Sequence, residues 1–330
     1  MTAPTTASTA TPASTSVPTT APTTAPTTVP TTSASAEPTP SRATRALAGF
    51  TRIGVVGSGT MGAGIAELCA LNGLDVRLAV SRPASLESAP RRLAASLDRR
   101  VAKGRLTPEG RDAALAAVSV GTDLGDLADR ELVVEAVVED EAVKLAVFST
   151  LDKVVEPDAI LASTTSALSI TRLAGVVQHP GRVLGVHFFN PVAVLDLVEL
   201  IPTLLTDESV CRRAEEFVTA LGKKPVTVGD RSGFVVNALL IPYLLAAIRM
   251  VESGYSSAES VDQAMESGCA HPMGPLKLAD FIGLDVVAAI AEALHAESRQ
   301  PLHAPPPLLS RMVEAGILGR KSGRGFHSYA

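Results

Sequence analysis

The chain contains few aromatic residues and few cysteines. Aromatics make up 3% of the 330 residues and tryptophan is absent, so the core has to be built from aliphatic side chains. The three cysteines, Cys69, Cys211 and Cys269, are odd in number and far apart, which argues against a disulfide framework and against a zinc site. We interpret them as buried, reduced thiols of a cytoplasmic protein.

Positive charge and long apolar runs are scarce as well. The net charge is −5, which argues against a nucleic-acid partner, since such a protein carries a basic domain. No apolar run reaches the roughly 20 residues of a membrane-spanning helix, so we expect no membrane partner. Hydrophobic residues still account for 46% of the chain, enough for a sizeable core in one or two domains.

Residues 1–46 consist almost entirely of Thr, Ala, Pro and Ser. Such a segment buries too little apolar surface to offset the entropy of ordering it, so we predict a disordered tail. It lacks the basic and apolar regions of a secretory signal, and no export signal supports a glycosylated stalk. A dispensable extension or a misplaced start codon is the simpler interpretation.

The stretch 51–73, TRIGVVGSGTMGAGIAELCALNG, joins an apolar strand to an apolar-periodic helix through Gly57, Gly59 and Gly62. A second strand follows at 75–80. A G-x-G-x-x-G pattern alone is weak, but between a strand and a helix it favours a dinucleotide-binding turn. The glycines let the backbone approach a pyrophosphate at the helix N-terminus. A tight turn without a ligand is the alternative.

The alternation of strands and helices continues, and we predict a Rossmann-like, doubly wound α/β domain over residues 47–230. Beyond it, residues 231–330 read as an all-α C-terminal domain. Its first predicted helix, 233–254, is apolar nearly all round, so we expect this domain to contact the substrate and to form a homodimer. The expected strands are 131–137, 159–164, 182–189, 194–201 and 224–230, and the expected helices are 139–155, 207–222, 257–268, 275–298 and 306–319.

Two ionisable residues interrupt the apolar stretch 184–201, LGVHFFNPVAVLDLVELI. Period two places Glu199 on an aliphatic face, where an unpaired carboxylate would cost several kcal/mol. His187 ends the preceding strand, and a turn at Asn190 would bring it back to Glu199. A carboxylate on one ring nitrogen leaves the other nitrogen as a general base. A structural His–Glu pair, or a histidine that caps a backbone carbonyl, explains the stretch equally well.

Six blocks of the chain together resemble the 3-hydroxyacyl-CoA dehydrogenase family, of the 3-hydroxybutyryl-CoA type. They cover residues 50–330 in order and read GSGTMGAGIA, STTSALSIT, GVHFFNPV with LVELI, SGFVVNALLIPYLLAAIRMVESG, HPMGPLKLADFIGLD and LGRKSGRGF. The resemblance implies an oxidoreductase that interconverts (S)-3-hydroxyacyl-CoA and 3-ketoacyl-CoA by hydride transfer with NAD(P)(H).

The resemblance also implies roles for four residues at the reacting centre. His187 is the general base and Glu199 its orienting carboxylate. Ser166 bonds the substrate oxygen, and Asn237 helps to hold the thioester and that oxygen. Ser166 has a competing interpretation as the N-cap of a following helix, and Asn237 as a buried structural amide.

For the cofactor, the resemblance points to the glycine turn and to five residues beyond it. These residues are Gly57, Gly59, Thr60, Met61 and Gly62, followed by Glu139, Lys144, Ser166, Asn190 and Lys321. For the CoA moiety, it points to Ser96 and Lys103, which lie two turns apart on one helical face, together with Ser166 and Asn237. Without the resemblance, the basic run 91–105 reads as a solvated helix.

One of the departures from the family pattern concerns the cofactor. The second strand should end in an acid that binds the ribose 2′-hydroxyl of NAD, but Val80 stands there, followed by Ser81 and Arg82. Ser81 and Arg82 suit the 2′-phosphate of NADP, so we hypothesise that NADP(H) is preferred. An NAD enzyme that has lost one contact is the alternative.

Two further readings of function stay open. A relative acting on a free hydroxy or sugar acid would have no use for Lys103. A non-catalytic relative would have no reason to keep Ser166, His187, Glu199 and Asn237 together.

Overall fold

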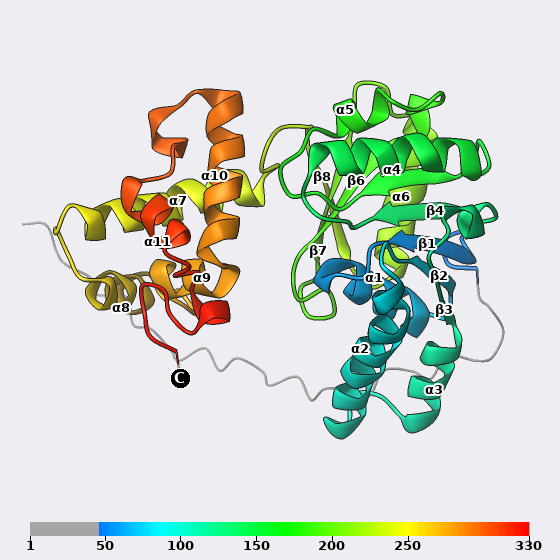
Figure 1. The fold of residues 1–330 in the computed structure, drawn as a ribbon, viewed down its shortest axis with the longest axis horizontal. Coiled ribbons are helices and arrows are strands. Elements are labelled where there is room, and N and C mark those ends of the chain that lie inside the picture. The colour runs from blue at the N-terminus through cyan, green and yellow to red at the C-terminus, as the bar shows by residue number, and fades with distance from the viewer. Residues whose placement is uncertain (1–45, 330) are drawn as a thin grey trace, which may run out of the picture. The chain divides into compact units, whose positions relative to one another are not determined.

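The computed structural model describes residues 46–329, and the predicted disordered tail, 1–46, lies outside these residues except for Ala46. The described chain forms an α/β part built on one eight-stranded sheet, followed by an all-α part (Figure 1). This is the predicted fold class. The strands are β1 Arg52–Val56, β2 Asp75–Ala79, β3 Val118–Gly121, β4 Leu132–Glu135, β5 Ile160–Ser163, β6 Val183–Phe188, β7 Leu197–Pro202 and β8 Lys224–Thr227.

The strand order is β3-β2-β1-β4-β5-β6-β7-β8, and every neighbouring pair is parallel except β6 and β7. The sheet is wound on both faces: Leu132 and Val134 of β4 belong to one apolar cluster, and Val133 between them belongs to another. The first cluster includes residues of α1 Thr60–Leu71, α2 Pro83–Ala102, α3 Pro108–Ala116 and α6 Glu208–Ala220. The second includes residues of α4 Glu141–Val154 and α5 Ile170–Ala174.

The all-α part has its own apolar core, formed by buried residues of five helices. These are α7 Val236–Glu252, α8 Ala258–Cys269, α9 Pro275–Ile282, α10 Leu284–Ser298 and α11 Pro307–Glu314. Leu244 and Ile248 of α7 are fully buried in this core, while Leu239 is 72% exposed on another side of the same helix. We propose a domain boundary at residues 230 and 231, which the end of β8 and the start of α7 support.

Several local predictions were wrong. The sequence interpretation missed β3 and α3, and it placed Leu195 in a buried strand, whereas β7 begins at Leu197 and Leu195 is 42% exposed. The predicted helix 275–298 is two helices, because Gly283 adopts φ +105°, outside the helical region. Of the three free thiols, only Cys69 is buried and Cys269 is exposed.

Candidate active site

A cavity of about 1020 Å³ lies at the carboxyl ends of the parallel strands β1, β2, β4 and β5. Ligands of open α/β sheets bind at this edge. The predicted cofactor residues Gly57, Gly59, Thr60, Met61, Ser81, Arg82, Glu139, Lys144 and Ser166 all line the cavity. Asp285, Val286, Ala289, Ile290 and Ala293 of α10 line it as well.

The glycine turn between β1 and α1 leaves its backbone open to a ligand. Gly57 has φ +103°, and a Cβ on Gly62 would lie 1.9 Å from the carbonyl oxygen of Gly57. Apart from its own chain neighbours, no atom within residues 46–329 lies within 4 Å of the place where a Cβ on Gly59 would stand. Gly62 is buried and is not among the residues that line the cavity. The turn therefore fits the pyrophosphate of a dinucleotide, as the spacing predicts.

Beside this turn, Lys144 is held by two carboxylates. Its Nζ donates to Glu135 Oε1 at 2.8 Å and lies 3.2 Å from Glu139 Oε2. Glu135, the last residue of β4, is fully buried and also accepts a hydrogen bond from Ser163 Oγ at 2.6 Å. Glu139 in turn accepts from the Ser166 main-chain N–H at 2.9 Å. The sequence interpretation did not include Glu135, because one glutamate in an apolar run gives no sign of its partner.

His187 and Glu199 face each other across the antiparallel pair β6 and β7. They are register partners, and the His187 Nδ1 to Glu199 Oε2 distance is 2.8 Å. Both residues are buried, at 4% and 1% exposure. Glu199 Oε1 accepts hydrogen bonds of 3.0 Å from the N–H groups of Val235 and Val236, where α7 begins.

The charge of Glu199 is stabilised in this position. Burial opposes its ionisation, but the hydrogen bond from His187 and the two main-chain donors outweigh burial and lower the pKa of this carboxyl below its ordinary value of 4.5. An ionised carboxylate only accepts hydrogen bonds, so the proton between the two groups belongs to His187 Nδ1. The Nε2 atom of the neutral ring then carries a lone pair. Phe189 and Phe234 flank the ring, with centroids 4.5 and 5.4 Å away.

Ser166 and Asn237 come from the loop after β5 and from the first turn of α7. Ser169, not Ser166, caps α5, since its hydroxyl accepts from the Arg172 N–H. The alternative interpretation of Ser166 as an N-cap is therefore wrong. The Ser166 hydroxyl and the Asn237 amide have no hydrogen-bond partner within residues 46–329, although Asn237 is only 9% exposed. Both side chains thus have donors free for a ligand.

Some predicted site residues lie outside the cavity lining. His187, Glu199 and Asn237 do not line it, and neither do Asn190, Ser96 and Lys103. Lys321 also lies outside, but its Nζ contacts Asp285 Oδ1 at 2.5 Å, and Asp285 lines the cavity. Lys103 is the C-cap of α2, and Ser96 lies within that helix. Arg92 belongs to the predicted basic run and was not predicted as a cofactor residue, but it lines the cavity.

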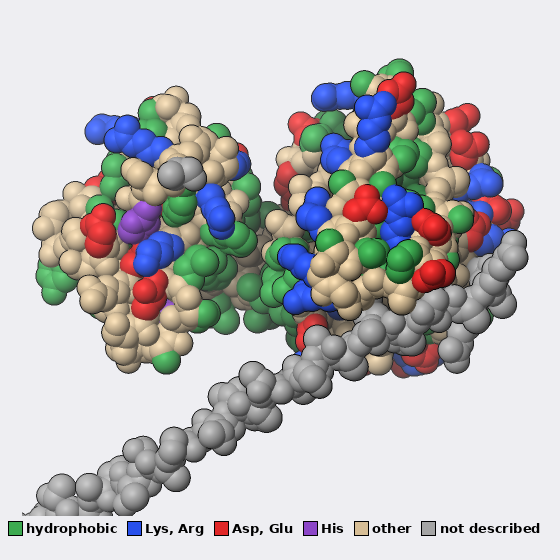
Figure 2. Space-filling view, turned by 90° about the horizontal axis from the view of Figure 1, so that it is seen from below, with side chains coloured by type: hydrophobic (Ala, Val, Ile, Leu, Met, Phe, Trp, Pro, Cys, Tyr) green, Lys and Arg blue, Asp and Glu red, His purple; other side chains and the backbone are tan. Residues whose placement is uncertain are grey.

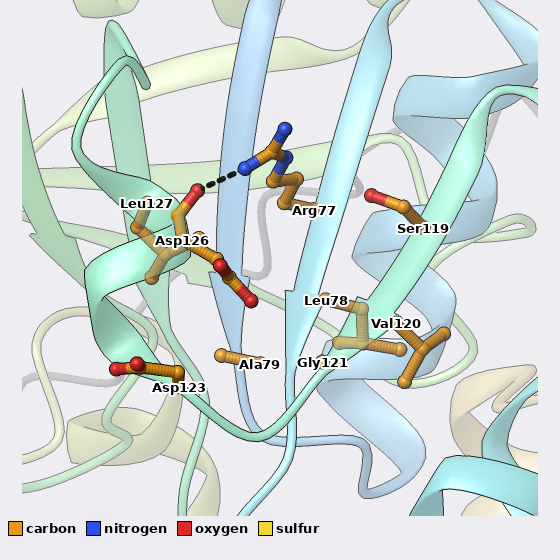
Figure 3. Close-up of a pocket in the computed structure, with 9 residues that line it drawn as sticks. All are labelled: Arg77, Leu78, Ala79, Ser119, Val120, Gly121, Asp123, Asp126 and Leu127. Carbon is orange, nitrogen blue, oxygen red and sulfur yellow. Dashed lines mark hydrogen bonds between the residues drawn. The ribbon is translucent and has the colours of Figure 1, made fainter.

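A second, smaller pocket lies between β2, β3 and the 3-10 turn Leu124–Leu127, as Figure 3 shows. There Arg77 Nη1 donates to the main-chain oxygen of Asp126 at 2.6 Å, and Asp123 accepts from the Gly125 N–H. No predicted site residue lines this pocket.

On the face drawn in Figure 2, lysine and arginine side chains are interspersed with aspartate and glutamate. None of the helices within residues 46–329 has the length and apolarity that crossing a membrane requires.

The glycine turn, the cavity at the strand ends and the parallel sheet define a dinucleotide-binding protein. Comparison with known proteins extends this result. A model described as "3-hydroxyacyl-CoA dehydrogenase, NAD binding domain" matches residues 52–231, and "3-hydroxyacyl-CoA dehydrogenase, C-terminal domain" matches residues 233–329. The chain belongs to the 3-hydroxyacyl-CoA dehydrogenase family and is an oxidoreductase.

Individual relatives agree with the family models. The chain is 55% identical over 280 residues to a 3-hydroxybutyryl-CoA dehydrogenase of Mycobacterium tuberculosis, covering 84% of this chain and 98% of the relative. The crystal structure of M. tuberculosis FadB2 has a TM-score of 0.84 at 55% identity and covers 85% of this chain and 99% of that one. The (S)-3-hydroxybutyryl-CoA dehydrogenase PaaH1 of Ralstonia eutropha has a TM-score of 0.82 at 42% identity, with 85% and 99% covered.

Proposed function

We propose that the chain interconverts (S)-3-hydroxyacyl-CoA and 3-ketoacyl-CoA, with 3-hydroxybutyryl-CoA and acetoacetyl-CoA as the substrate pair. The observation that carries this proposal is the buried hydrogen bond between His187 and Glu199. Within residues 46–329, Nε2 of His187 has no hydrogen-bond partner and can act as a base, and the chain belongs to a family of dehydrogenases. Two of the relatives named above, the M. tuberculosis enzyme of 55% identity and PaaH1 of Ralstonia eutropha, are named 3-hydroxybutyryl-CoA dehydrogenases, which supports the short-chain substrate.

The residues act on the substrate oxygen as follows. In oxidation, His187 Nε2 takes the proton of the 3-hydroxyl, and Glu199 stabilises the imidazolium that forms. In reduction, the imidazolium returns the proton to the same oxygen. The bound nicotinamide supplies the hydride acceptor in oxidation and the hydride donor in reduction. The free donors of Ser166 and Asn237 stabilise charge on the substrate oxygen, by about 2–4 kcal/mol for each donor.

Replacing the base tests this mechanism. We expect His187→Gln to lower kcat by at least roughly a hundredfold, the scale of acid–base catalysis, in an assay that follows oxidation of the reduced cofactor by acetoacetyl-CoA. His179→Gln, at an exposed histidine outside the site, is the matched control and should keep wild-type turnover. Near-normal turnover in a folded His187→Gln enzyme would show that another group is the base.

The CoA moiety distinguishes this substrate from a free hydroxy acid. Ser96 and Lys103 of α2 are the proposed contacts, and Lys103 is exposed and available to a phosphate. Lys103→Ala should raise KM for acetoacetyl-CoA, while Lys153→Ala, at an exposed lysine of α4, should not. If acetoacetate were turned over as well as its CoA ester, and Lys103→Ala changed neither KM, the free-acid reading would replace this one.

We propose that the cofactor is NAD(P)(H), with NADP(H) preferred. Val80, Ser81 and Arg82 line the cavity at the end of β2, where an acid would bind the ribose of NAD. Glu139, Lys144, Asn190 and Lys321 are the other proposed cofactor residues. Initial rates with each cofactor test the preference, and a much higher kcat/KM with NADH than with NADPH would refute it.

We also propose a cytoplasmic homodimer that associates through the all-α part. The exposed apolar side chains of Leu239 in α7 and Phe281 in α9, 72% and 47% exposed, support such an interface. Leu239→Asp should shift the mass measured by light scattering from dimer to monomer. A monomeric wild-type protein at micromolar concentration would contradict the proposal. The free thiols of Cys69, Cys211 and Cys269 support the compartment.

A further inference from the structure

Arg92 lines the cofactor cavity although it belongs to the middle of α2. Its Nη2 donates to the carbonyl oxygen of Ser58 at 2.6 Å and lies 3.3 Å from Ser58 Oγ. Ser58 stands between Gly57 and Gly59, so the guanidinium is fixed against the glycine turn. The charge of this arginine therefore has a defined position beside the dinucleotide cavity.

Ser81, Arg82 and Ser85 line the same cavity as Arg92. Arg82 is the N-cap residue of α2, and its side chain makes no capping hydrogen bond. The carboxylates that line the cavity, Glu139 and Asp285, belong to the loop before α4 and to α10. The lining residues that follow β2 thus supply two guanidinium groups and two hydroxyls, and no acid.

The hydrogen-bond capacity of Arg92 is largely unused. A guanidinium has five N–H donors, and only Nη2 has an acceptor within residues 46–329. A carboxylate would bind the ribose hydroxyls by accepting hydrogen bonds from them, and the lining residues that follow β2 include no carboxylate. A phosphate needs donors, and two of its oxygens match the planar fork of an arginine.

We propose that Arg92 is a specificity-determining residue that binds the 2′-phosphate of the cofactor's adenosine ribose, together with Arg82, Ser81 and Ser85. This inference rests on the proposed preference for NADP(H) and adds a residue to it that is distant from β2 in sequence. Because Arg92 also donates a hydrogen bond to Ser58, its side chain would contact both the glycine turn and the 2′-phosphate.

Binding of two nucleotide fragments by the full-length protein tests Arg92 without turnover. Calorimetric titration gives Kd for 2′,5′-ADP, which carries the 2′-phosphate, and for 5′-AMP, which does not. We expect wild-type protein to bind 2′,5′-ADP more tightly. Arg92→Leu should lower the ratio of the Kd for 5′-AMP to the Kd for 2′,5′-ADP roughly tenfold or more, the scale of one charge-assisted hydrogen bond. Arg92→Lys, which keeps the charge but not the planar fork, should give an intermediate ratio.

Arg91→Leu is the matched control. Arg91 neighbours Arg92 on α2, pairs with Glu87 and is 77% exposed outside the cavity, so its replacement should leave the ratio unchanged. A wild-type preference that survives in Arg92→Leu and Arg92→Lys would overturn the role of Arg92 and leave the cofactor proposal intact. Equal weakening of both fragments would also overturn it, since Arg92 would then bind the phosphate they share. Wild-type protein without any preference for 2′,5′-ADP would contradict the NADP(H) proposal itself.

Discussion

Glu199→Gln separates the charge of the buried carboxylate from its shape. In the wild type, Glu199 Oε2 accepts from His187 Nδ1, and Oε1 accepts from two main-chain N–H groups. The substituted amide has one oxygen, which can still accept from the main chain. Its NH₂ group then faces Nδ1 and can only donate. The neutral ring must therefore place its own proton on Nε2, where it blocks the base.

The expected decrease in kcat of Glu199→Gln has two contributions. A hydrogen bond to a charged group contributes about 1.5–3 kcal/mol, and its absence from the imidazolium corresponds to about 10- to 150-fold in kcat. The wrong tautomer increases this loss. The equivalent Asp-to-Asn change in a serine protease triad, in which both contributions are included, lowers kcat by about 10⁴-fold. We therefore expect Glu199→Gln to lower kcat by roughly 10²- to 10⁴-fold.

The assay is steady-state reduction of acetoacetyl-CoA, with circular dichroism to verify folding. Glu131→Gln is the matched control, because Glu131 also accepts from two main-chain N–H groups, those of Thr51 and Arg52, but contacts no histidine. It should lower stability and leave kcat unchanged. A folded Glu199→Gln enzyme with wild-type kcat would refute the role of Glu199 as the orienting group.

The same carboxylate predicts a pH dependence of stability. The folded-state pKa of Glu199 lies below its ordinary value of 4.5, so its ionised form stabilises the fold above pH 4.5. This contribution is lost as the pH falls through the folded-state pKa. In urea unfolding, the stability difference between wild type and Glu199→Gln should therefore be largest near neutral pH and shrink below pH 4.5. A difference that grows on acidification would have the wrong sign.

Three further outcomes follow from local geometry. Gly62→Ala should destabilise the fold in thermal unfolding, because its Cβ would meet the Gly57 oxygen at 1.9 Å, whereas Gly59→Ala should fold normally and weaken only dinucleotide binding. Burial raises the pKa of the Cys69 thiol to about 12, so a thiol reagent at pH 8 should modify exposed Cys269 and spare Cys69 until the protein unfolds. Lys223→Met should lower the unfolding free energy by about 1–3 kcal/mol in urea, because Lys223 Nζ donates to two carbonyls of the loop before β7.

The sequence predicted what depends on local pattern. The glycine spacing predicted the turn before α1, and period-two burial predicted that Glu199 needs a partner on the neighbouring strand. It did not predict β3, which has only four residues and is half-exposed, so its pattern is too short to distinguish from a loop. The break at Gly283 was missed because the apolar periodicity continues through it.

Contacts between distant segments were harder to predict. The position of Arg92 depends on how α2 packs beside the glycine turn, which a basic run on a helix does not reveal. Glu135 and Asp285 were missed for the same reason, since each is defined by a lysine partner from another element. The cavity also contains residues of α10, about 230 positions beyond the turn, and no local signal in the sequence links the two.

The antiparallel pairing of β6 with β7 has a consequence for length variation in this part of the chain. His187 and Glu199 meet because their strands are in one fixed alignment. Residues 189–196 connect the strands, and an insertion in this connection would leave the alignment of the pair intact. A single-residue insertion within β7 itself would send the carboxylate to the opposite side of the sheet, away from the imidazole. Homologous chains that keep this chemistry should therefore differ in length between the two strands and not inside them.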